Sequence, residues 1–162
     1  AAGLVVPGVG AFAACMRGLV AVGGDVIVRE RVAKKRPTLG ICVGMQILFR
    51  DGDERADGAL HEGVGIWQES ITKLDAPILP HMGWNTLAIR PSQALFKNIA
   101  EQDDVYFVHS FYCELSKYTI ASCDYITTFS AAMQKDNFYA TQFHPEKSAS
   151  VGEKILNNFL QL

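Results

Sequence analysis

The chain has 162 residues, 49% of them hydrophobic and 20% charged, a composition typical of a single globular domain. Its net charge of −2 predicts neither nucleic acid nor a membrane surface as a partner, and no apolar run is long enough to span a bilayer. The four cysteines lack paired spacing and the four histidines do not cluster, which argues against a disulfide framework or a metal site and favours a reducing, cytoplasmic location.

The first third of the chain alternates between short apolar runs and segments with helical spacing. A buried strand is predicted at residues 4–6, ending at a turn rich in proline and glycine, and a helix at residues 11–22. A second helix at residues 26–35, a second strand at residues 38–41 and a third helix at residues 43–49 follow. This order of elements indicates a parallel α/β sheet.

The second half differs, because strand candidates follow one another with few helices between them. Asp136 and Asn137 separate two of these candidates and predict a hairpin turn, and residues 150–160 predict a closing amphipathic helix. We therefore expect one α/β domain over residues 1–162 with a mixed sheet. The strand candidates are "GVGIWQESITKL", "GWNTLAIR", "DVYFVHSFYCEL", "YTIASC", "FSAAMQK" and "FYATQFHPE".

The stretch "GICVGMQ", residues 40–46, places Cys42 between a predicted strand and a predicted helix. A cysteine at such a turn meets the free N–H groups that open the helix, which favour the thiolate and lower the thiol pKa. Gly40 and Gly44 suit a tight bend where bulkier side chains would collide, and the same amides could hold an oxyanion. Taken alone, the pattern fits a small buried core thiol better.

A second motif, "QFHPE" at residues 142–146, follows an apolar run that ends a strand. In extended backbone, residues i and i+2 point to the same side, so His144 and Glu146 can face each other, and Pro145 stiffens the link. A carboxylate beside an imidazole sets its tautomer, and the imidazole can then take a proton from a thiol. Cys42 and His144 both follow strand ends, where parallel sheets place their sites.

The other three histidines lack such a neighbour. His81, in "PHMGW", and His109, in "FVHSF", stand beside small or aromatic residues, so we expect structural roles for both. His61, in "ALHEG", is expected to be solvated.

Three motifs together, "PGVGAF", "GICVGMQ" and "QFHPEKS", resemble the class I (triad) glutamine amidotransferases. "PHMGWN" and "YFVHSFY" are most similar to the glutaminase subunits of imidazole glycerol phosphate synthase, which serve histidine biosynthesis. The resemblance covers nearly the whole chain and implies a three-layer, flavodoxin-like α/β fold with a mixed, mostly parallel sheet and helices on both faces. The family has a further strand and helix before the segment that begins here, so we expect an N-terminally truncated chain.

The resemblance implies a role for each residue of the two catalytic motifs. Cys42 would be the nucleophile, His144 the general base and then acid, and Glu146 the carboxylate that orients the histidine. Glutamine would be hydrolysed to glutamate and ammonia through a glutamyl thioester, without metal or cofactor. The amides expected to hold the oxyanion are those of Val9 or Gly10 and Val43.

Two further sets of residues carry implied roles. The first binds the glutamine substrate and consists of Gln46, Glu54, Ser110 and Phe111, the last standing where the family more often has tyrosine. The second faces the partner and consists of Met82, Trp84, Asn85 and Lys147. That partner is a (βα)8-barrel cyclase subunit, joined in a heterodimer, which uses the ammonia to form imidazole glycerol phosphate and aminoimidazole carboxamide ribotide. The alternatives to an interface role are a core aromatic for Trp84 and a solvated charge for Lys147.

Other functions stay open at this level. A γ-glutamyl hydrolase, or the glutaminase subunit of another class I amidotransferase such as that of pyridoxal phosphate synthesis, shares the nucleophile and the histidine–glutamate pair, but we do not expect "PHMGWN" there. A non-catalytic α/β binding subunit with a vestigial site is opposed by the presence of all three triad residue types.

Overall fold

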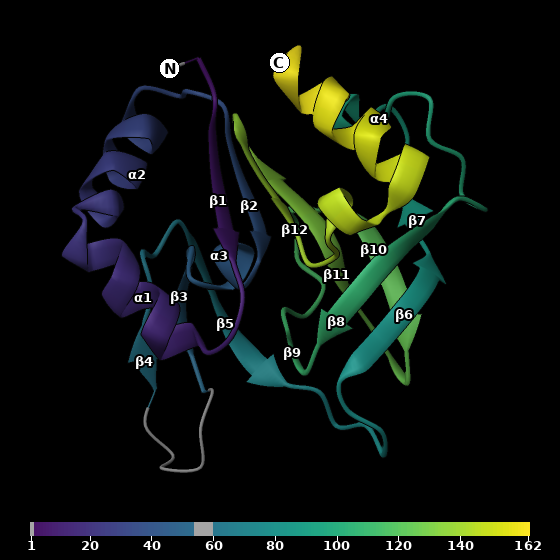
Figure 1. Ribbon diagram of the computed structural model, residues 1–162, viewed down its shortest axis with the longest axis horizontal. Helices are drawn as coiled ribbons and strands as arrows, with labels where there is room; N and C mark the ends of the chain where they lie inside the picture. The colour runs from purple at the N-terminus through teal and green to yellow at the C-terminus, as the bar shows by residue number, and fades with distance from the viewer. Residues whose placement is uncertain (1, 54–59) are drawn as a thin grey trace.

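In the computed structural model, which describes residues 2–53 and 60–162, three parallel strands form the centre of the fold. They are β1 (Leu4–Gly8), β2 (Thr38–Cys42) and β12 (Phe138–Thr141), with β2 in the middle (Figure 1). The register pairs Gly8 with Cys42 and Thr141 with Ile41, so the carboxyl ends of all three strands meet at one edge. Every residue of β2 is buried, as expected of a short apolar strand with neighbours on both sides.

Antiparallel strands extend this centre into a six-stranded mixed sheet of order β1-β2-β12-β11-β10-β7. A hairpin joins β11 to β12, and its turn is Asp136–Asn137 as predicted, with Asp136 at φ 51°. The parallel pairing of this sheet is therefore confined to its first three strands. The added strands are β7 (Ala88–Ile89), β10 (Thr119–Tyr125) and β11 (Thr127–Lys135).

The remaining strands form two smaller sheets. One has the order β4-β3-β5-β9, with β3 parallel to β5. The other is the antiparallel pair of β6 (His81–Thr86) and β8 (Asp104–His109). The strands of the first are β3 (Phe49–Gly52), β4 (His61–Glu62), β5 (Trp67–Lys73) and β9 (Phe111–Tyr112).

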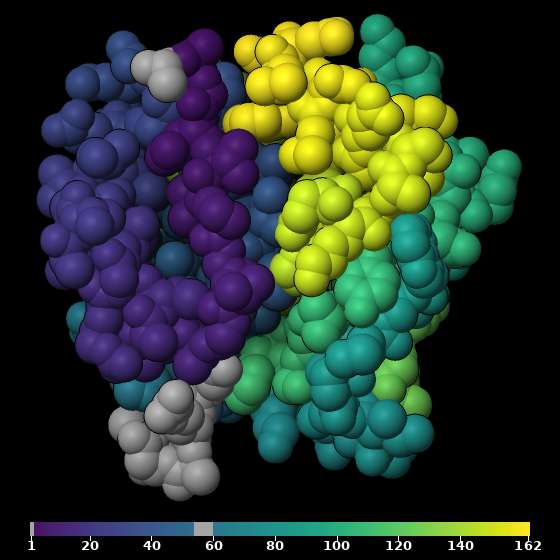
Figure 2. Space-filling model, in the orientation of Figure 1, coloured from purple at the N-terminus to yellow at the C-terminus, as the bar shows by residue number. Residues whose placement is uncertain are grey.

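The helices flank the six-stranded sheet: α1 and α2 lie beside β1, and α4 lies at the other end of the view in Figure 1. In Figure 2 the purple N-terminal segment covers one half of the visible face, and the yellow C-terminal helix with the teal and green strands covers the other. Within the described residues, none of the helices has the length and apolar character needed to cross a membrane. The helices are α1 (Phe12–Ala21), α2 (Gly24–Ala33), α3 (Val43–Gln46) and α4 (Ala149–Leu160), with short 3-10 turns η1 (Ala94–Phe96) and η2 (Pro145–Lys147).

The α/β class, the mixed sheet and three of the four predicted helices are confirmed, while several boundaries differ. The second helix runs from Gly24 to Ala33 and not over residues 26–35. The predicted helix at residues 43–49 ends at Gln46, because Phe49 already belongs to β3, where it pairs with Trp67 of β5. The first strand does not stop before Pro7 but continues to Gly8. In this structure β1 ends its sheet, and a proline is tolerated there because an edge strand leaves N–H groups unpaired.

One aromatic ring joins the six-stranded sheet to the β6–β8 pair. Phe129 of β11 is fully buried, and its ring centroid lies 5.7 Å from that of Phe107 and 4.9 Å from that of His109, both on β8. His81 of β6 is also in contact, at 5.8 Å. The Phe129 side chain therefore forms the contact between the six-stranded sheet and the β6–β8 pair.

Truncating this ring is expected to destabilise the fold strongly. Phe129→Ala removes a fully buried ring and leaves a cavity between two sheets, so the free energy of unfolding should fall by about 3–5 kcal/mol in urea titrations. Leu160→Ala, at a position 78% exposed, is the control and should change it by less than about 0.5 kcal/mol. A Phe129→Ala loss as small as that of the control would show that the ring does not join the sheets.

Candidate active site

Cys42 occupies a strained turn at the carboxyl end of β2. Its backbone has φ 54° and ψ −116°, a conformation that side chains other than glycine rarely adopt. A Cβ on Gly44 would collide with the Val6 carbonyl of β1, and one on Gly40 would lie 2.8 Å from the Gly44 oxygen. Only glycine fits either position, so the predicted sharp bend between strand and helix is confirmed.

His144 and Glu146 form a close pair. The Nδ1 atom of His144 lies 2.6 Å from the Glu146 carboxylate, to which it donates. The pair does not arise from alternation in extended backbone as predicted, because Glu146 lies in the 3-10 turn η2, directly after His144. The His144 side chain is only 2% exposed, and its Nε2 has no hydrogen-bond partner among the described residues. One ring nitrogen is thus held and the other is free to take a proton.

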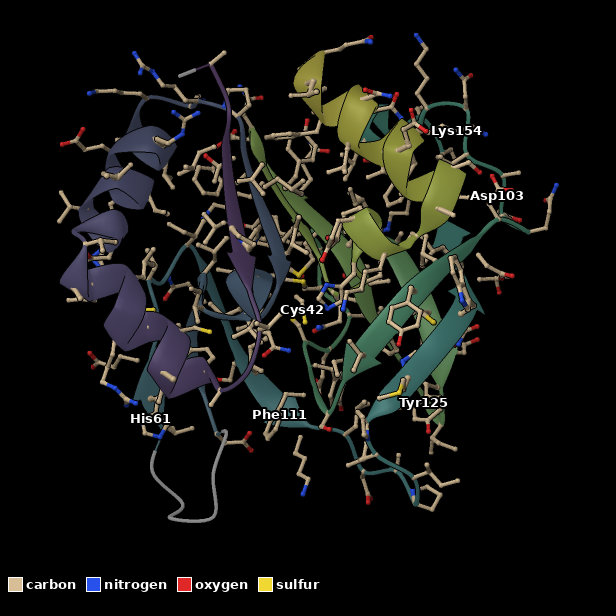
Figure 3. All side chains as sticks on the ribbon, in the orientation of Figure 1. Cys42, His61, Asp103, Phe111, Tyr125 and Lys154 are labelled. Atoms are coloured by element: carbon tan, nitrogen blue, oxygen red, sulfur yellow. The ribbon has the colours of Figure 1, made fainter. Side chains whose placement is uncertain are left out.

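A cavity of about 290 Å³ brings the predicted residues together. Cys42, central in Figure 3, and His144 both line it, although their side chains are not within hydrogen-bond distance of each other. The predicted oxyanion and substrate residues that line it are Val9, Gly10, Val43, Gln46, Ser110 and Phe111. Sequence reasoning missed three lining residues, Pro80, Val108 and His109.

The segment between β1 and α1 contributes backbone to this cavity at Val9 and Gly10. Gly10 has φ 89°, a conformation in which a side chain would be strained. The Cys15 thiol lies 3.2 Å from the Val9 carbonyl oxygen and donates to it. That carbonyl therefore points toward α1, and the N–H of Gly10 in the same peptide points the opposite way.

Burial dominates the electrostatics of the thiol. It raises the pKa of Cys42 to about 11, although the Val43 N–H bonded to the sulfur acts in the opposite direction. Nearby Glu146 raises this pKa further and Lys147 lowers it. The prediction of a lowered pKa was therefore wrong, because α3 is a single turn of four residues and its amides do not offset the loss of water. The thiol is protonated near neutral pH and needs a base to become a nucleophile.

Two buried glutamines connect Cys42 to β9. Gln46 Nε2 lies 3.1 Å from the Phe111 carbonyl oxygen and 3.1 Å from Gln142 Oε1, and it donates to both. Gln142 Nε2 lies 3.9 Å from the sulfur of Cys42. Gln142 belongs to the "QFHPE" motif but had no assigned role. The signal in the sequence was a glutamine directly after an apolar strand, and the structure shows that it is fully buried.

The predicted partner-facing residues are mostly exposed. Met82 and Trp84 of β6 are 61% and 54% exposed, so the alternative of a core aromatic for Trp84 was wrong. Lys147 is exposed, and Asn85 is half-buried with its side-chain nitrogen 3.1 Å from the Asp124 carbonyl oxygen. Glu54 lies outside the described residues.

The remaining histidines differ in part from expectation. His81 and His109 are both buried, in keeping with structural residues, but they bond to each other at 2.9 Å, and His109 reaches the cavity. His61, in β4, is half-buried rather than solvated. Across residues 2–53 and 60–162, no three His, Cys, Asp or Glu side chains are grouped so as to hold a metal ion.

Comparison with known proteins gives a consistent result. The family model described as "Glutamine amidotransferase class-I" matches residues 2–162. The chain is 45% identical to "Imidazole glycerol phosphate synthase subunit HisH" of Corynebacterium glutamicum and of Thermobifida fusca, covering 98% of this chain and 79% of each relative. The protein of the same name from Mycobacterium bovis is 46% identical, covering 98% of this chain and 78% of its own.

Solved structures share the fold. One called a glutamine amidotransferase superposes with a TM-score of 0.71 at 16% identity, covering 98% of this chain and 77% of that one. A glutamine amidotransferase from Thermotoga maritima gives 0.67 at 15% identity, covering 99% of this chain and 63% of that one.

The turn at Cys42 yields a prediction from its glycines. In Gly44→Ala the added methyl group has no space against β1, so the free energy of unfolding should fall by about 2–4 kcal/mol and the alkylation rate of Cys42 should change. The matched control is Gly18→Ala on the exposed side of α1, where nothing lies within 4 Å of the new Cβ. It should leave the alkylation rate unchanged and add up to about 1 kcal/mol of stability. Equal effects of the two substitutions would contradict the close approach.

The raised pKa predicts the pH dependence of thiol reactivity. Because only the thiolate is alkylated, and a higher pKa moves its formation to higher pH, the iodoacetamide rate at Cys42 should rise about tenfold per pH unit from about pH 7 to about pH 9.5 without levelling off. The rate is read from the mass of the Cys42 peptide in the free protein. A plateau below about pH 9 would show that the amides of α3 outweigh burial after all.

Proposed function

This chain belongs to the class I glutamine amidotransferase family, and from that premise we propose that it is the glutaminase subunit of an imidazole glycerol phosphate synthase. It hydrolyses glutamine to glutamate and ammonia for histidine biosynthesis. One observation carries the chemistry: a single cavity holds the thiol of Cys42 and the imidazole of His144, whose other nitrogen is bound by Glu146. The triad is thus Cys42, His144 and Glu146.

The first half of the reaction forms a thioester. As the sulfur of Cys42 attacks the side-chain carbonyl carbon of glutamine, its proton passes to Nε2 of His144, the free ring nitrogen. Glu146 stabilises the imidazolium through Nδ1. The imidazolium then protonates the amide nitrogen, the carbon–nitrogen bond breaks, and ammonia leaves a glutamyl thioester on the sulfur. Since the thiol pKa is about 11, this proton transfer accompanies the attack rather than preceding it.

The second half releases glutamate. A water molecule gives a proton to His144 and attacks the thioester carbon, and the histidine returns that proton to the departing sulfur. In both halves the carbonyl oxygen becomes negative. The amide of Val43, already bonded to the sulfur, and the N–H of Gly10 or Val9 at the same cavity are the donors for this oxyanion.

The partner is a cyclase, which receives the ammonia, and we propose that it is a (βα)8 barrel bound as a heterodimer. The exposed apolar side chains of Met82 and Trp84 on β6 support a docking surface there, because such residues are enriched at the centres of interfaces. The Trp84 ring packs edge-on against the ring of Tyr106 of β8, with 5.9 Å between ring centroids, and this contact restrains the indole. Asn85 and Lys147 complete the proposed interface.

We place the protein in the cytoplasm, since the buried thiols of Cys42, Cys113 and Cys123 are not in disulfides, which suits a reducing compartment. The cysteine chemistry needs no metal or cofactor. The similarity to three subunits named for imidazole glycerol phosphate synthase favours this function over that of another class I glutaminase.

Covalent labelling tests the function. A diazo-ketone analogue of glutamine should add once to the protein, on Cys42, in the presence of the cyclase, and ammonia release should rise when the liganded cyclase is added. Cys42→Ala should abolish both. The matched control, Cys123→Ala, removes a buried thiol of β10 and should keep both. Absence of an adduct with the cyclase present would favour a binding subunit, and equal ammonia release with and without the cyclase would contradict this partner.

A further inference from the structure

Two buried histidines face each other across the β6–β8 pair. His81 and His109 are opposite in register, and Nδ1 of His81 lies 2.9 Å from Nε2 of His109. Both side chains are at most 5% exposed, and both stack among aromatic rings, with Tyr125 4.1 Å from His81 between ring centroids. His109 also lines the catalytic cavity. The reaction described above uses neither of them.

The partners of His109 determine where the protons are. Its Nδ1 lies 2.9 Å from the Phe111 carbonyl oxygen, which can only accept, so Nδ1 carries a proton. Burial lowers the pKa of His109 to about 3, so the neutral ring has no second proton and Nε2 is an acceptor. The proton between the rings therefore belongs to Nδ1 of His81. Burial also lowers the pKa of His81, which leaves its Nε2 bare, 3.5 Å from the Asn85 side-chain nitrogen.

The Phe111 carbonyl also determines the orientation of Gln46. Both its donors, His109 Nδ1 and Gln46 Nε2, come from side chains that border the cavity. Because a carbonyl cannot donate, the nitrogen end of the Gln46 carboxamide must face it, and the second N–H of that nitrogen is taken by Gln142. The group that Gln46 can offer to a ligand is consequently its oxygen.

We propose that His81 and His109 are positioning residues which hold the Phe111 carbonyl, and that this carbonyl keeps the oxygen of Gln46 available to accept hydrogen bonds from the nitrogen groups of the glutamine substrate. The inference rests on the proposed function. Without the histidine pair, the Phe111 carbonyl loses one of its two donors. Gln46 is then free to turn its carboxamide, and substrate binding weakens while the triad stays intact.

Kinetics with the cyclase present separate positioning from simple packing. His109→Leu removes the donor to Phe111 and should raise KM for glutamine about tenfold or more while kcat changes less than about threefold. His109→Asn places an amide N–H near the position of Nδ1 and should restore KM to within about threefold of the unmodified protein. The control is Tyr125→Phe, at a residue labelled in Figure 3. It keeps the ring stacked on His81 and removes only the hydroxyl that donates to the Ile78 carbonyl oxygen, so KM should not change.

The outcomes are distinct. If His109→Leu and His109→Asn behave alike, or if kcat falls while KM is unchanged, the positioning role is wrong even though the glutaminase is real. If the unmodified protein with its cyclase releases no ammonia, the proposed function fails and the substrate role of Gln46 fails with it.

A measurement on the unmodified protein does not depend on any variant folding. Long-range proton–nitrogen NMR spectra should show both His81 and His109 protonated on Nδ1 and bare on Nε2 at neutral pH, the tautomer that free imidazole side chains adopt less often. A proton on Nε2 of either ring would overturn the assigned direction of the hydrogen bonds and the proposal with it.

Discussion

The register of three parallel strands is the constraint on which the site depends. Hydrogen bonding across β1, β2 and β12 places Gly8 opposite Cys42 and Thr141 opposite Ile41. The carboxyl ends of all three strands therefore lie at the same edge of the sheet. The backbone proposed to hold the oxyanion, the proposed nucleophile Cys42 and the proposed base His144 are each within a few residues of that edge. The bend at Cys42 is tolerated because the backbone of β1 approaches so closely that only glycine fits at position 44. A shift of register would separate these groups.

The thiol illustrates the balance between burial and charge. An exposed cysteine at the N-terminus of a longer helix would have a lowered thiol pKa, but Cys42 is 4% exposed and its pKa is about 11. A neutral thiol is stable next to the apolar lining and reacts only slowly with electrophiles at neutral pH. In the proposed mechanism its activation depends on Nε2 of His144, which has no hydrogen-bond partner within the described part of the chain. Because Cys42 is buried, the reactivity of its thiol depends on how the cavity places it relative to His144.

The Phe111 carbonyl shows how a single acceptor can order several side chains. Two donors converge on it, from His109 and Gln46, and each is oriented by the fact that a carbonyl has no proton to give. Such buried polar groups are costly unless satisfied, which is why they occur as a connected set rather than singly. The resemblance led us to expect tyrosine more often than phenylalanine at position 111, but the role proposed here belongs to the backbone oxygen, which every residue type supplies.

The sequence alone determined the local chemistry and most of the elements. Periodicity located α1, α2 and α4, and the turn residues Asp136 and Asn137 located the hairpin, because these depend on neighbours within a few positions. The motif "QFHPE" indicated the pair of His144 with Glu146, although a 3-10 turn and not extended backbone brings them together. Tertiary structure decided what depends on distant residues. It ended α3 after four residues, raised the thiol pKa by burial, and brought His81 and His109 together from positions 28 residues apart. Desolvation and contacts across strands arise only when the chain folds, so no local pattern carries them.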